Sequence, residues 1–271
     1  MKVLVIGATG ELGRQVASAL VDRDGVSVRA FVRRRPPGGD ARAGVTGPTD
    51  VVVGDLGDRA SLRRAVTGMD AVFLVSSPAP DQVELETNAI DAAERVGVVR
   101  IVKVSNIPIA GLESGLHGNH RAIERRLDAS SCAVTVLQPS FFASVVDKQR
   151  DLIAQGKLVL PTGRGKIAWI DPYDIAAVAA EALVRADLDG PLHLTGPEAL
   201  DGDEVAARLG VRRLDPPLGR WRDAAVASGL DPWLADSTVH LYEAVAVGAL
   251  AETTSTVARV LGRPPRRVFD S

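Results

Sequence analysis

The chain of 271 residues nearly balances its charge, with 32 lysines and arginines against 34 aspartates and glutamates. This balance excludes the basic surface typical of nucleic-acid-binding proteins, so no nucleic-acid partner is expected. No apolar stretch approaches the about 20 residues that span a bilayer, so we also expect no membrane association. The single cysteine, Cys132, excludes an internal disulfide framework and predicts a cytoplasmic protein in which this thiol only packs against its neighbours.

The first thirteen residues carry the most informative pattern. Val3 to Ile6 form a short apolar run typical of a buried parallel strand, glycines follow at positions 7, 10 and 13, and residues 14–21 predict an amphipathic helix. In such a turn the glycines allow the tight bend, the approach of a pyrophosphate to the backbone, and close helix–strand packing. The helix N-terminus offers N–H groups to the phosphates. The alternative is an ordinary glycine-rich turn. The predicted dinucleotide contacts are Gly7, Thr9, Gly10, Glu11, Leu12 and Gly13.

Strands and helices alternate through the rest of the first half. Further strands are predicted at residues 27–33, 50–53, 71–76, 100–104 and 133–137, and helices at 61–67, 83–96 and 119–129, the first of them capped by Asp58. Such alternation implies right-handed crossovers onto a parallel sheet with helices on both faces. We therefore predict an α/β protein of Rossmann type, with a doubly wound parallel sheet.

After Pro139 the pattern changes. It predicts helices at 145–156 and 175–185, the second capped by Asp174, short strands at 166–170 and 192–194, and mostly helices from residue 200 onward. The chain thus divides into an NAD(P)-binding domain over residues 1–138 and a smaller, mostly helical substrate-binding region over 139–271, partly interwoven with the first. An exposed apolar helix near 238–249 would form a lid or a dimer face, and the protein is expected to be a monomer or a homodimer.

The end of the second strand predicts which cofactor binds. An NAD-selective fold places Asp or Glu there to hold the ribose 2′-hydroxyl. Here the sequence reads Phe31-Val32-Arg33-Arg34-Arg35. A guanidinium pairs with a 2′-phosphate in bidentate fashion, whereas a carboxylate would repel it. The alternative is a solvated basic turn. We predict NADP(H), with Arg33 as the main ligand and Arg34 as a helper.

The ends of the third and fourth strands supply further cofactor contacts. Asp55 is expected to accept a hydrogen bond from the adenine amino group, while the backbone N–H of Leu56 meets a ring nitrogen. The alternative role for Asp55 is a helix N-cap, for which Asp58 is better placed. Val75, Ser76 and Ser77 should run beneath the adenosine ribose and pyrophosphate.

Together these motifs resemble the NmrA-like group of atypical short-chain dehydrogenases, which includes bacterial quinone reductases and cofactor-sensing regulators. The matching stretches cover essentially the whole chain: Gly7 to Gly13, Phe31 to Arg33, Gly54 to Leu56, Asn88 to Ala93, His120 to Glu124, Thr135 to Phe142, Trp169 to Asp174 and Leu194 to Pro197. The resemblance implies that the four residues from Pro139 to Phe142 line the nicotinamide side of the site. It places Ser105 and Asn106 nearby.

One departure from ordinary short-chain dehydrogenases concerns the proton donor. Those enzymes protonate a carbonyl oxygen from a Tyr-x-x-x-Lys pair. This chain has only Tyr173 and Tyr242, each followed four residues later by alanine. By rough register His117 replaces the tyrosine and Arg121 replaces the lysine. The usual proton relay is therefore absent from the sequence.

His117 and His120 are the best candidates for protonating or stabilising the developing anion, because imidazole titrates near neutral pH. Gly115 and Gly118 predict that His117 lies on a loop. The alternative is that His120 packs against or caps the helix while His117 faces solvent. Ser105 would either donate to a substrate carbonyl or bond the backbone at its strand end. A quinone would need no dedicated acid, because its hydroquinone anion can take a proton from water.

Other chemistries lack support in the sequence. No spacing of His, Cys and carboxylate residues resembles a metal site, so no metal is expected. The Gly-x-Ser-x-Gly motif of hydrolases is also missing. The three tryptophans, Trp169, Trp221 and Trp233, would anchor the core or line an aromatic substrate pocket.

Two functions remain open. The first is an NADPH-dependent reductase that transfers a hydride to a ketone, a quinone or a conjugated C=C of an apolar small molecule. The abundance of Leu, Val, Ala and Trp beyond residue 139 suits an apolar pocket of that kind. The second is a regulatory protein that binds NADP(H) and changes its partner contacts without turnover, which the missing tyrosine and lysine favour. The substrate cannot be identified from the sequence.

Overall fold

The structure is a computed structural model that describes residues 1–34 and 49–270. The chain forms two compact units. Unit 1 comprises Met1–Ser105, Asn119–Gln138 and Ile175–Leu192, and unit 2 comprises Asn106–Gly118, Pro139–Asp174 and His193–Ser271. One passage between the units falls between Gln138 and Pro139, where the sequence placed its domain boundary. A single division there would assign residues 106–118 to the first unit and residues 175–192 to the second. The structure instead assigns residues 106–118 to unit 2 and residues 175–192 to unit 1.

Unit 1 is built on a sheet whose strands are β1 (Lys2–Ile6), β2 (Ser27–Val32), β3 (Thr49–Val53), β4 (Ala71–Leu74), β5 (Arg100–Val104), β6 (Ala133–Pro139) and β8 (Gly190–Leu194), the last residues of β6 and β8 counting with unit 2. They lie in the order β3-β2-β1-β4-β5-β6-β8, and the pairs from β3 to β6 are parallel. The Rossmann fold has this order, with its reversal between β1 and β4. The predicted fold class and the predicted strands of the first half are therefore confirmed.

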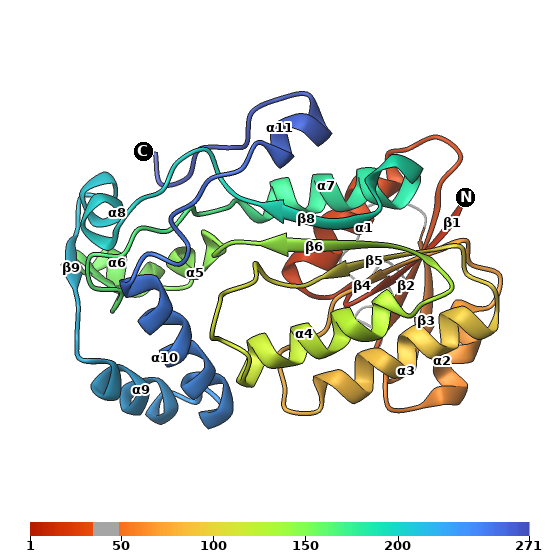
Figure 1. The fold of residues 1–271 in the computed structure, drawn as a ribbon, viewed down its shortest axis with the longest axis horizontal. Coiled ribbons are helices and arrows are strands. Elements are labelled where there is room, and N and C mark those ends of the chain that lie inside the picture. Colours follow the sequence, from red (N-terminus) through yellow and green to blue (C-terminus); the bar gives the residue numbers. More distant parts are fainter. Residues whose placement is uncertain (35–48, 271) are drawn as a thin grey trace. The chain divides into compact units, whose positions relative to one another are not determined.

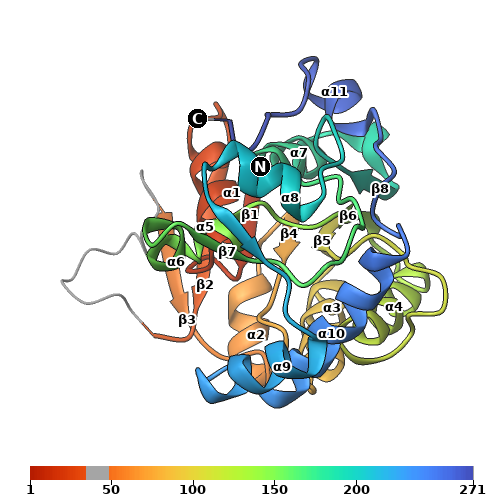
Figure 2. The same ribbon diagram turned by 90° about the vertical axis from the view of Figure 1, so that its left-hand side faces the viewer.

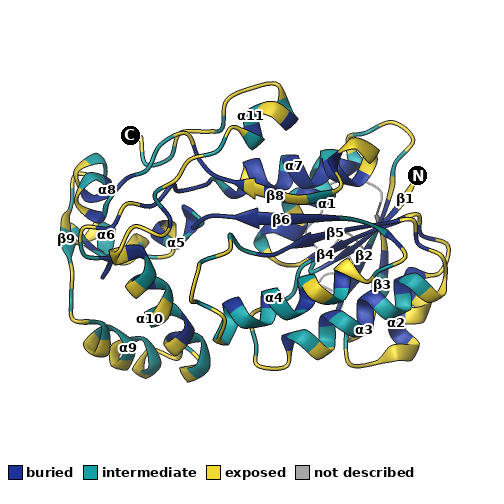
Figure 3. Cartoon of the chain, viewed as in Figure 1, coloured by how far each residue is buried: buried dark blue, intermediate teal, exposed yellow. Residues whose placement is uncertain are grey.

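Helices cover both faces of this sheet (Figures 1 and 2). One face carries α1 (Glu11–Val21) and α7 (Pro172–Val184), followed by a short 3-10 helix at Ala186–Leu188. The other face carries α2 (Arg59–Val66), α3 (Gln82–Arg95) and α4 (Gly115–Asp128). Every residue of β4 and β5 is buried, as the dark blue strands of Figure 3 show. Burial on both faces explains why β4 is a continuous apolar run, while β5 departs from that pattern at Arg100 and Lys103.

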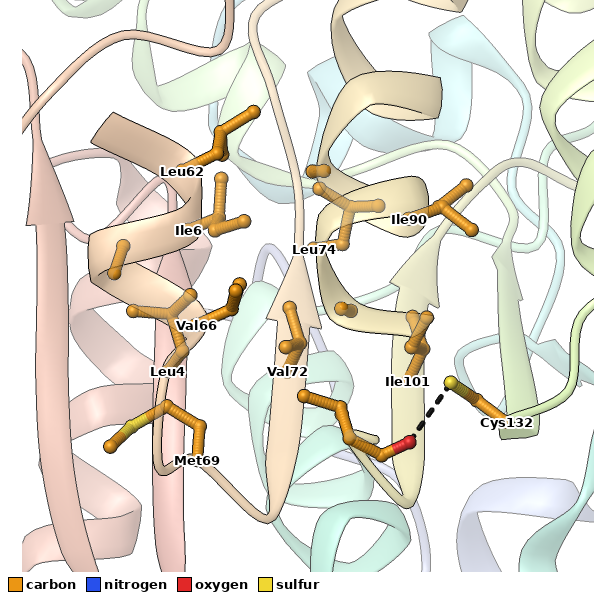
Figure 4. Packing of buried hydrophobic residues seen from close by; sticks show 14 of the residues in the cluster. Leu4, Ile6, Leu62, Val66, Met69, Val72, Leu74, Ile90, Ile101 and Cys132 are labelled. Atoms are coloured by element: carbon orange, nitrogen blue, oxygen red, sulfur yellow. Dashed lines mark hydrogen bonds between the residues drawn. The ribbon is translucent and has the colours of Figure 1, made fainter. Parts of the chain in front are cut away.

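The core between the sheet and α2, α3 and α4 is almost wholly apolar (Figure 4). Leu4, Val72 and Ile101 project into it from three strands. Cys132 lies at its border, where its Sγ donates a hydrogen bond to the carbonyl of Val98 at 3.0 Å. Burial raises the pKa of this thiol. The structure thus agrees with a packing role for Cys132, because the reactive form of a cysteine is the thiolate.

Unit 2 holds short elements: α5 (Ser144–Asp147), α6 (Arg150–Ala154), β7 (Lys157–Val159), α8 (Gly202–Arg208), β9 (Arg212–Leu214), α9 (Leu218–Ala227), α10 (Pro232–Ala246) and α11 (Thr256–Leu261). Its core includes an aromatic group. Phe141 packs edge-on against Trp169 at 5.2 Å between ring centroids and stacks on Tyr242 at 6.1 Å. The Nε1–H of Trp169 donates to the carbonyl of Leu200 at 3.2 Å.

Two predicted elements of unit 2 were wrong. The helix expected over 145–156 is divided into α5 and α6, because the side chain of Gln149 bonds both backbone groups of Val159 at 2.9 Å and draws this segment onto β7. The strand expected over 166–170 consists only of isolated bridges at Ile167 and Ile170. Successive backbone groups there bond to three different segments, around Leu200, Leu250 and Phe141, so no ladder forms. The strands β7 and β9, which pair with each other, were not predicted.

The N-cap predicted for α7 was also wrong. The helix begins at Pro172, and the side chain of Asp171 accepts from the backbone N–H of Tyr173 at 2.8 Å. Asp174 instead is fully buried and accepts from the Arg263 guanidinium at 2.8 Å and from the backbone N–H of Arg266 at 2.6 Å. It therefore anchors the C-terminal segment of unit 2. By contrast, Asp58 caps α2 as predicted, accepting from the N–H of Ala60.

Two further helices differ from expectation. The helix α4 begins at Gly115, so His117 lies within it and not on a loop. Gly115 adopts a φ of 55°, which gives the chain its entry into the helix. The apolar helix expected near 238–249 is α10, which spans Pro232–Ala246 and buries Tyr242 and Val245 in the core of unit 2. One side of α10 therefore belongs to the core of unit 2, so the helix is not the exposed apolar helix that the sequence predicted.

Candidate active site

The glycine-rich turn after β1 has the geometry that its sequence predicts. Gly7 has a φ of 81°, and a Cβ there would lie 2.4 Å from the carbonyl oxygen of Val75. A Cβ on Gly13 would lie 2.1 Å from the carbonyl oxygen of Gly7, because α1 starts directly against the turn. The N–H of Gly10 closes the turn with a 2.9 Å bond to Gly7. Only glycine fits at the first and third positions.

The N-terminus of α1 has no side-chain cap. Its N-cap residue is Gly10. Thr9 and Gly10 are exposed, Glu11 is half-buried, and Leu12 and Gly13 are buried. Free N–H groups and the helix dipole favour phosphate at such a position. The turn also lies beside β4, next to the reversal of strand order where Rossmann folds bind nucleotides.

The predicted cofactor-selecting residues lie at the ends of β2 and β3. Arg33 and Arg34 directly follow β2 and are exposed, while Arg35 lies outside the described residues. Asp55 follows β3, is exposed, and accepts from the N–H of Gly57 at 2.8 Å through Oδ1. Leu56 is half-buried. These residues thus occupy the carboxyl ends of neighbouring strands in unit 1, the edge at which the glycine-rich turn also lies.

The residues after β4 divide between the turn and a buried network. Val75 is half-buried and its carbonyl faces Gly7. Ser76 is half-buried, and its hydroxyl donates to Glu86 Oε1 on α3 at 2.7 Å. Ser77 is exposed. Ser76 therefore connects the predicted pyrophosphate region to the side chains beneath the neighbouring strand.

Those side chains form a network that sequence reasoning missed. Lys103 on β5 and Glu86 on α3 make an ion pair at 3.0 Å, with both side chains fully buried. The Lys103 ammonium also donates to the carbonyl of Val104 and lies 3.5 Å from His120 Nδ1. Gln82 donates to Glu86 at 3.2 Å. The signal available in the sequence was a lysine inside a strand buried on both faces, where a charged side chain needs a partner.

A second network surrounds Ser105 at the end of β5. Its hydroxyl donates to Glu124 at 2.5 Å and accepts from Arg121 at 3.1 Å. Arg121 pairs with Glu124 at 2.7 Å, and Gln138 donates to the same carboxylate at 3.0 Å. Burial lowers the pKa of Arg121, and Glu124 partly offsets this effect. The hydroxyl proton of Ser105 is thus bound to the Glu124 side chain, whereas the structural alternative predicted from the sequence was a bond to the backbone.

The remaining predicted residues belong to unit 2. His117 is buried on α4, and Asn106 is half-buried. Pro139 is buried and its carbonyl accepts from the N–H of Ile107 at 3.0 Å. Phe142 is half-buried and forms a parallel bridge with Ile170. The residues predicted to contact the ADP part of the cofactor therefore lie in unit 1, together with Ser105 and His120. Unit 2 holds the other four predicted residues, His117, Asn106, Pro139 and Phe142.

The aromatic residues of unit 2 are largely structural. Trp169 is buried in the core, Trp221 packs against it, and Trp233 is half-buried in the first turn of α10. Burial raises the pKa of Tyr242 to about 12, so this phenol is a poor acid near neutral pH. Across residues 1–34 and 49–270, no group of His, Cys, Asp and Glu is arranged to hold a metal ion, and no helix is long and apolar enough to cross a membrane.

Comparison with known proteins defines the class to which this fold and site belong. A family model described as NAD(P)H-binding matches residues 7–186, so the chain belongs to this NAD(P)H-binding family. The match begins at the first glycine of the turn after β1. The resemblance to atypical short-chain dehydrogenases and reductases is thereby confirmed.

Several relatives are similar over nearly their whole length. An NAD(P)H azoreductase of Xenophilus azovorans is 34% identical over 278 residues, covering 97% of this chain and 94% of the relative. A (4-alkanoyl-5-oxo-2,5-dihydrofuran-3-yl)methyl phosphate reductase of Streptomyces griseus is 34% identical, covering 99% and 95%. The NADPH complex of an Escherichia coli quinone oxidoreductase superposes with a TM-score of 0.85 at 25% identity, covering 99% and 97%. This chain is accordingly an NAD(P)H-dependent oxidoreductase.

Proposed function

We propose that this protein is an NADPH-dependent reductase that transfers a hydride to a quinone, a ketone or a conjugated C=C of an apolar small molecule. The observation that carries the proposal is the arrangement at the carboxyl edge of the unit 1 sheet. There a glycine-only turn and an uncapped helix N-terminus lie beside the β1–β4 reversal, with two exposed arginines at the end of β2. Backbone N–H groups would hold the pyrophosphate, and the arginines would hold a 2′-phosphate.

The basic end of β2 supports NADPH over NADH. A cofactor without the 2′-phosphate would be held there by a carboxylate on its ribose hydroxyls. Arg33 and Arg34 occupy this position, and both are exposed, so neither is consumed by a buried ion pair. The relative from E. coli was crystallised with NADPH, which agrees with this assignment.

The names of the relatives support a conjugated, electron-poor acceptor. One relative is an azoreductase and another a quinone oxidoreductase. Hydride transfer to such acceptors needs an aligned nicotinamide, and the reduced anion is stable enough to take its proton from water. This agrees with a chain that has no Tyr-x-x-x-Lys pair. Turnover in the relatives favours an enzyme over the alternative of a cofactor-sensing regulator.

A ketone would make a stronger demand, since an alkoxide forms and must be stabilised. Among the three candidates His120 has the best position, in unit 1 beside the buried pair Lys103–Glu86 at the end of β5. The Ser105 hydroxyl already donates a hydrogen bond to Glu124, and His117 belongs to unit 2. We therefore assign the stabilisation of the anion to His120.

Titration calorimetry with both cofactors tests the NADPH assignment. We expect wild type to bind NADPH more tightly than NADH, and Arg33→Asp to lower NADPH affinity by about 10- to 100-fold, the range for a lost charge-assisted hydrogen bond. Arg64→Asp, an exposed arginine on α2, is the matched control for charge alone. Equal affinities of wild type for the two cofactors would contradict the assignment.

Oxidation of NADPH, followed by absorbance, tests turnover. We expect substrate-dependent oxidation with a naphthoquinone and a slower reaction with an aryl ketone. An azo dye and an enone complete the panel. If NADPH binds but no acceptor of the panel is reduced, the reductase proposal is wrong and the sensing function takes its place.

A further inference from the structure

Three side chains continue the apolar core of unit 1 to the carboxyl edge of its sheet. Ile101 on β5, Ile90 on α3 and Ile123 on α4 belong to one apolar cluster, and Figure 4 shows the first two. One step further along each element lie Lys103, two residues after Ile101, Glu86, four residues before Ile90, and His120, three residues before Ile123. These spacings keep each polar residue on the core-facing side of its element.

The ammonium of Lys103 has three hydrogens and three polar neighbours. Glu86 Oε2 lies 3.0 Å away, the carbonyl of Val104 is in direct contact, and His120 Nδ1 lies 3.5 Å away. An ammonium can only donate. The third contact is therefore favourable only if Nδ1 of His120 presents its lone pair, which places the ring proton on Nε2.

Glu86 is held in place from both of its carboxylate oxygens. Its Oε1 accepts from Ser76 at 2.7 Å and from Gln82 at 3.2 Å, while its Oε2 receives Lys103. Two hydrogen bonds and one ion pair thus fix the position of this carboxylate. The ammonium that it holds beside His120 disfavours a second positive charge on the imidazole.

Such a pair is an expensive way to build a core. Two fully buried charges lose their hydration, and an apolar pair of similar volume is often as stable or more stable. The pair lies at the edge of the sheet where the cofactor contacts are predicted, and Glu86 accepts a hydrogen bond from Ser76 there. This position suggests that the pair has a chemical role and not a stabilising one.

We propose that Glu86 and Lys103 are positioning residues that fix His120 as a neutral imidazole with its proton on Nε2. This inference rests on the proposed function for its catalytic meaning, because His120 is the group assigned to the substrate anion. In this tautomer His120 can donate to an anion from Nε2 without first taking up a proton from solvent. The unit Glu86–Lys103–His120 then replaces the missing Tyr-x-x-x-Lys pair.

The same contacts balance a proton transfer. When hydride from NADPH reaches a carbonyl carbon, the electron pair of the C=O bond moves to oxygen. His120 gives its Nε2 proton to that oxygen, and its Nδ1 takes a proton from Lys103. The imidazole stays neutral and Lys103 becomes an amine. A proton from solvent then binds Nε2, and the Nδ1 proton returns to Lys103, which restores both groups.

The test reads the tautomer directly. The full chain, with its histidines labelled with ¹⁵N and bound to NADP⁺, gives two-bond ¹H–¹⁵N spectra near neutral pH, in which the protonated ring nitrogen is identified. The His120 signals are assigned by their loss in His120→Gln. We expect a neutral ring with its proton on Nε2. If the wild-type protein shows the His120 proton on Nδ1, or protons on both ring nitrogens, that result by itself overturns the proposal.

The double variant Lys103→Met with Glu86→Gln removes both charges together, so no unpaired charge stays buried. In it we expect the His120 signals to report a mixture of tautomers, and the kcat for an aryl ketone to fall about 10-fold or more. The exposed pair Lys166–Glu204, changed in the same way, is the matched control and should alter neither readout. An unchanged Nε2–H signal in the Lys103→Met, Glu86→Gln variant would overturn the positioning role. Absence of turnover with every acceptor would instead remove the proposed function and leave the tautomer result standing.

Discussion

A group of polar side chains lies between α3 and α4 near each end of the two helices, and the two groups differ in burial and in composition. At the N-terminal ends Glu86 and His120 flank Lys103, with the lysine and the glutamate fully buried. At the C-terminal ends Arg126 on α4 reaches Asp91 and Glu94 on α3 at 2.7 and 2.6 Å. Those three side chains keep between a fifth and a third of their surface exposed.

The two groups differ in the hydration that their charged side chains lose on folding. The partly exposed group around Arg126 costs little hydration and pins two helices together. The buried group costs several kcal/mol of hydration for each ion and depends on complete hydrogen bonding. Its position beside the predicted cofactor contacts supports the positioning role that we propose for it. The following variants are designed to break this contrast or to sharpen it.

The largest effect is expected from Lys103→Met, which leaves Glu86 buried without its ion-pair partner. The free energy of unfolding should fall by about 3–5 kcal/mol. Adding Glu86→Gln should recover a large part of that loss, because no charge then remains buried. Urea unfolding followed by circular dichroism measures both. If Lys103→Met costs no more than a change at Arg126, the contrast between the two ends is wrong.

The second effect concerns catalysis. His120→Ala should lower the kcat for an aryl ketone by about 100-fold while NADPH affinity stays unchanged, because the anion loses its donor. A quinone should be affected much less, since water can protonate its reduced anion. Arg126→Met, at the other end of the same helices, should leave both rates unaltered. Full ketone activity in His120→Ala would show that this histidine is structural.

A smaller loss of stability is expected from Arg126→Met itself. We expect about 1 kcal/mol at low salt, as for partly exposed ion pairs, and less as ionic strength rises. The cost of Lys103→Met should hardly change with salt, because buried charges are poorly screened. Urea unfolding at two salt concentrations separates the two cases. A strong salt dependence at Lys103 would mean that water reaches it.

The smallest effect is a pH dependence at the partly exposed end. Hydrogen bonds from Arg126 hold the pKa of Glu94 below its ordinary value. A depressed carboxyl pKa stabilises the folded protein above the unfolded-state pKa of about 4.3, and this contribution disappears as pH falls through the folded-state pKa. The stability difference between wild type and Arg126→Met should therefore be full at neutral pH and shrink below about pH 4. A difference that stays constant down to acid pH would contradict the assignment to Glu94.

The sequence predicted those parts of the molecule that local pattern determines. The turn from Gly7 to Gly13 was recognisable because each glycine answers a local steric demand, which the clashes at Gly7 and Gly13 confirm. The strands of unit 1 were recognisable because burial on both faces requires continuous apolar runs. Asp58 was recognisable as a cap for the same local reason.

The parts that were missed depend on contacts between distant segments. Lys157–Val159 forms a strand only because Arg212–Leu214 lies beside it. The helix expected over 145–156 is interrupted because Gln149 bonds Val159. Lys103 was overlooked because its partners come from α3 and α4, 17 residues away on either side. Such partners become visible only when the elements are packed together.

The repeated passage of the chain between its units also matters during synthesis. The segment Ile175–Leu192, which supplies most of α7 and the start of β8 to unit 1, is made only after Pro139–Asp174 of unit 2. While the ribosome makes that intervening stretch, β6 is a bare edge strand with unpaired backbone groups. A chain truncated near residue 138 should therefore bind chaperones or aggregate, and one that extends past residue 194 should have a completed sheet and be released from that risk.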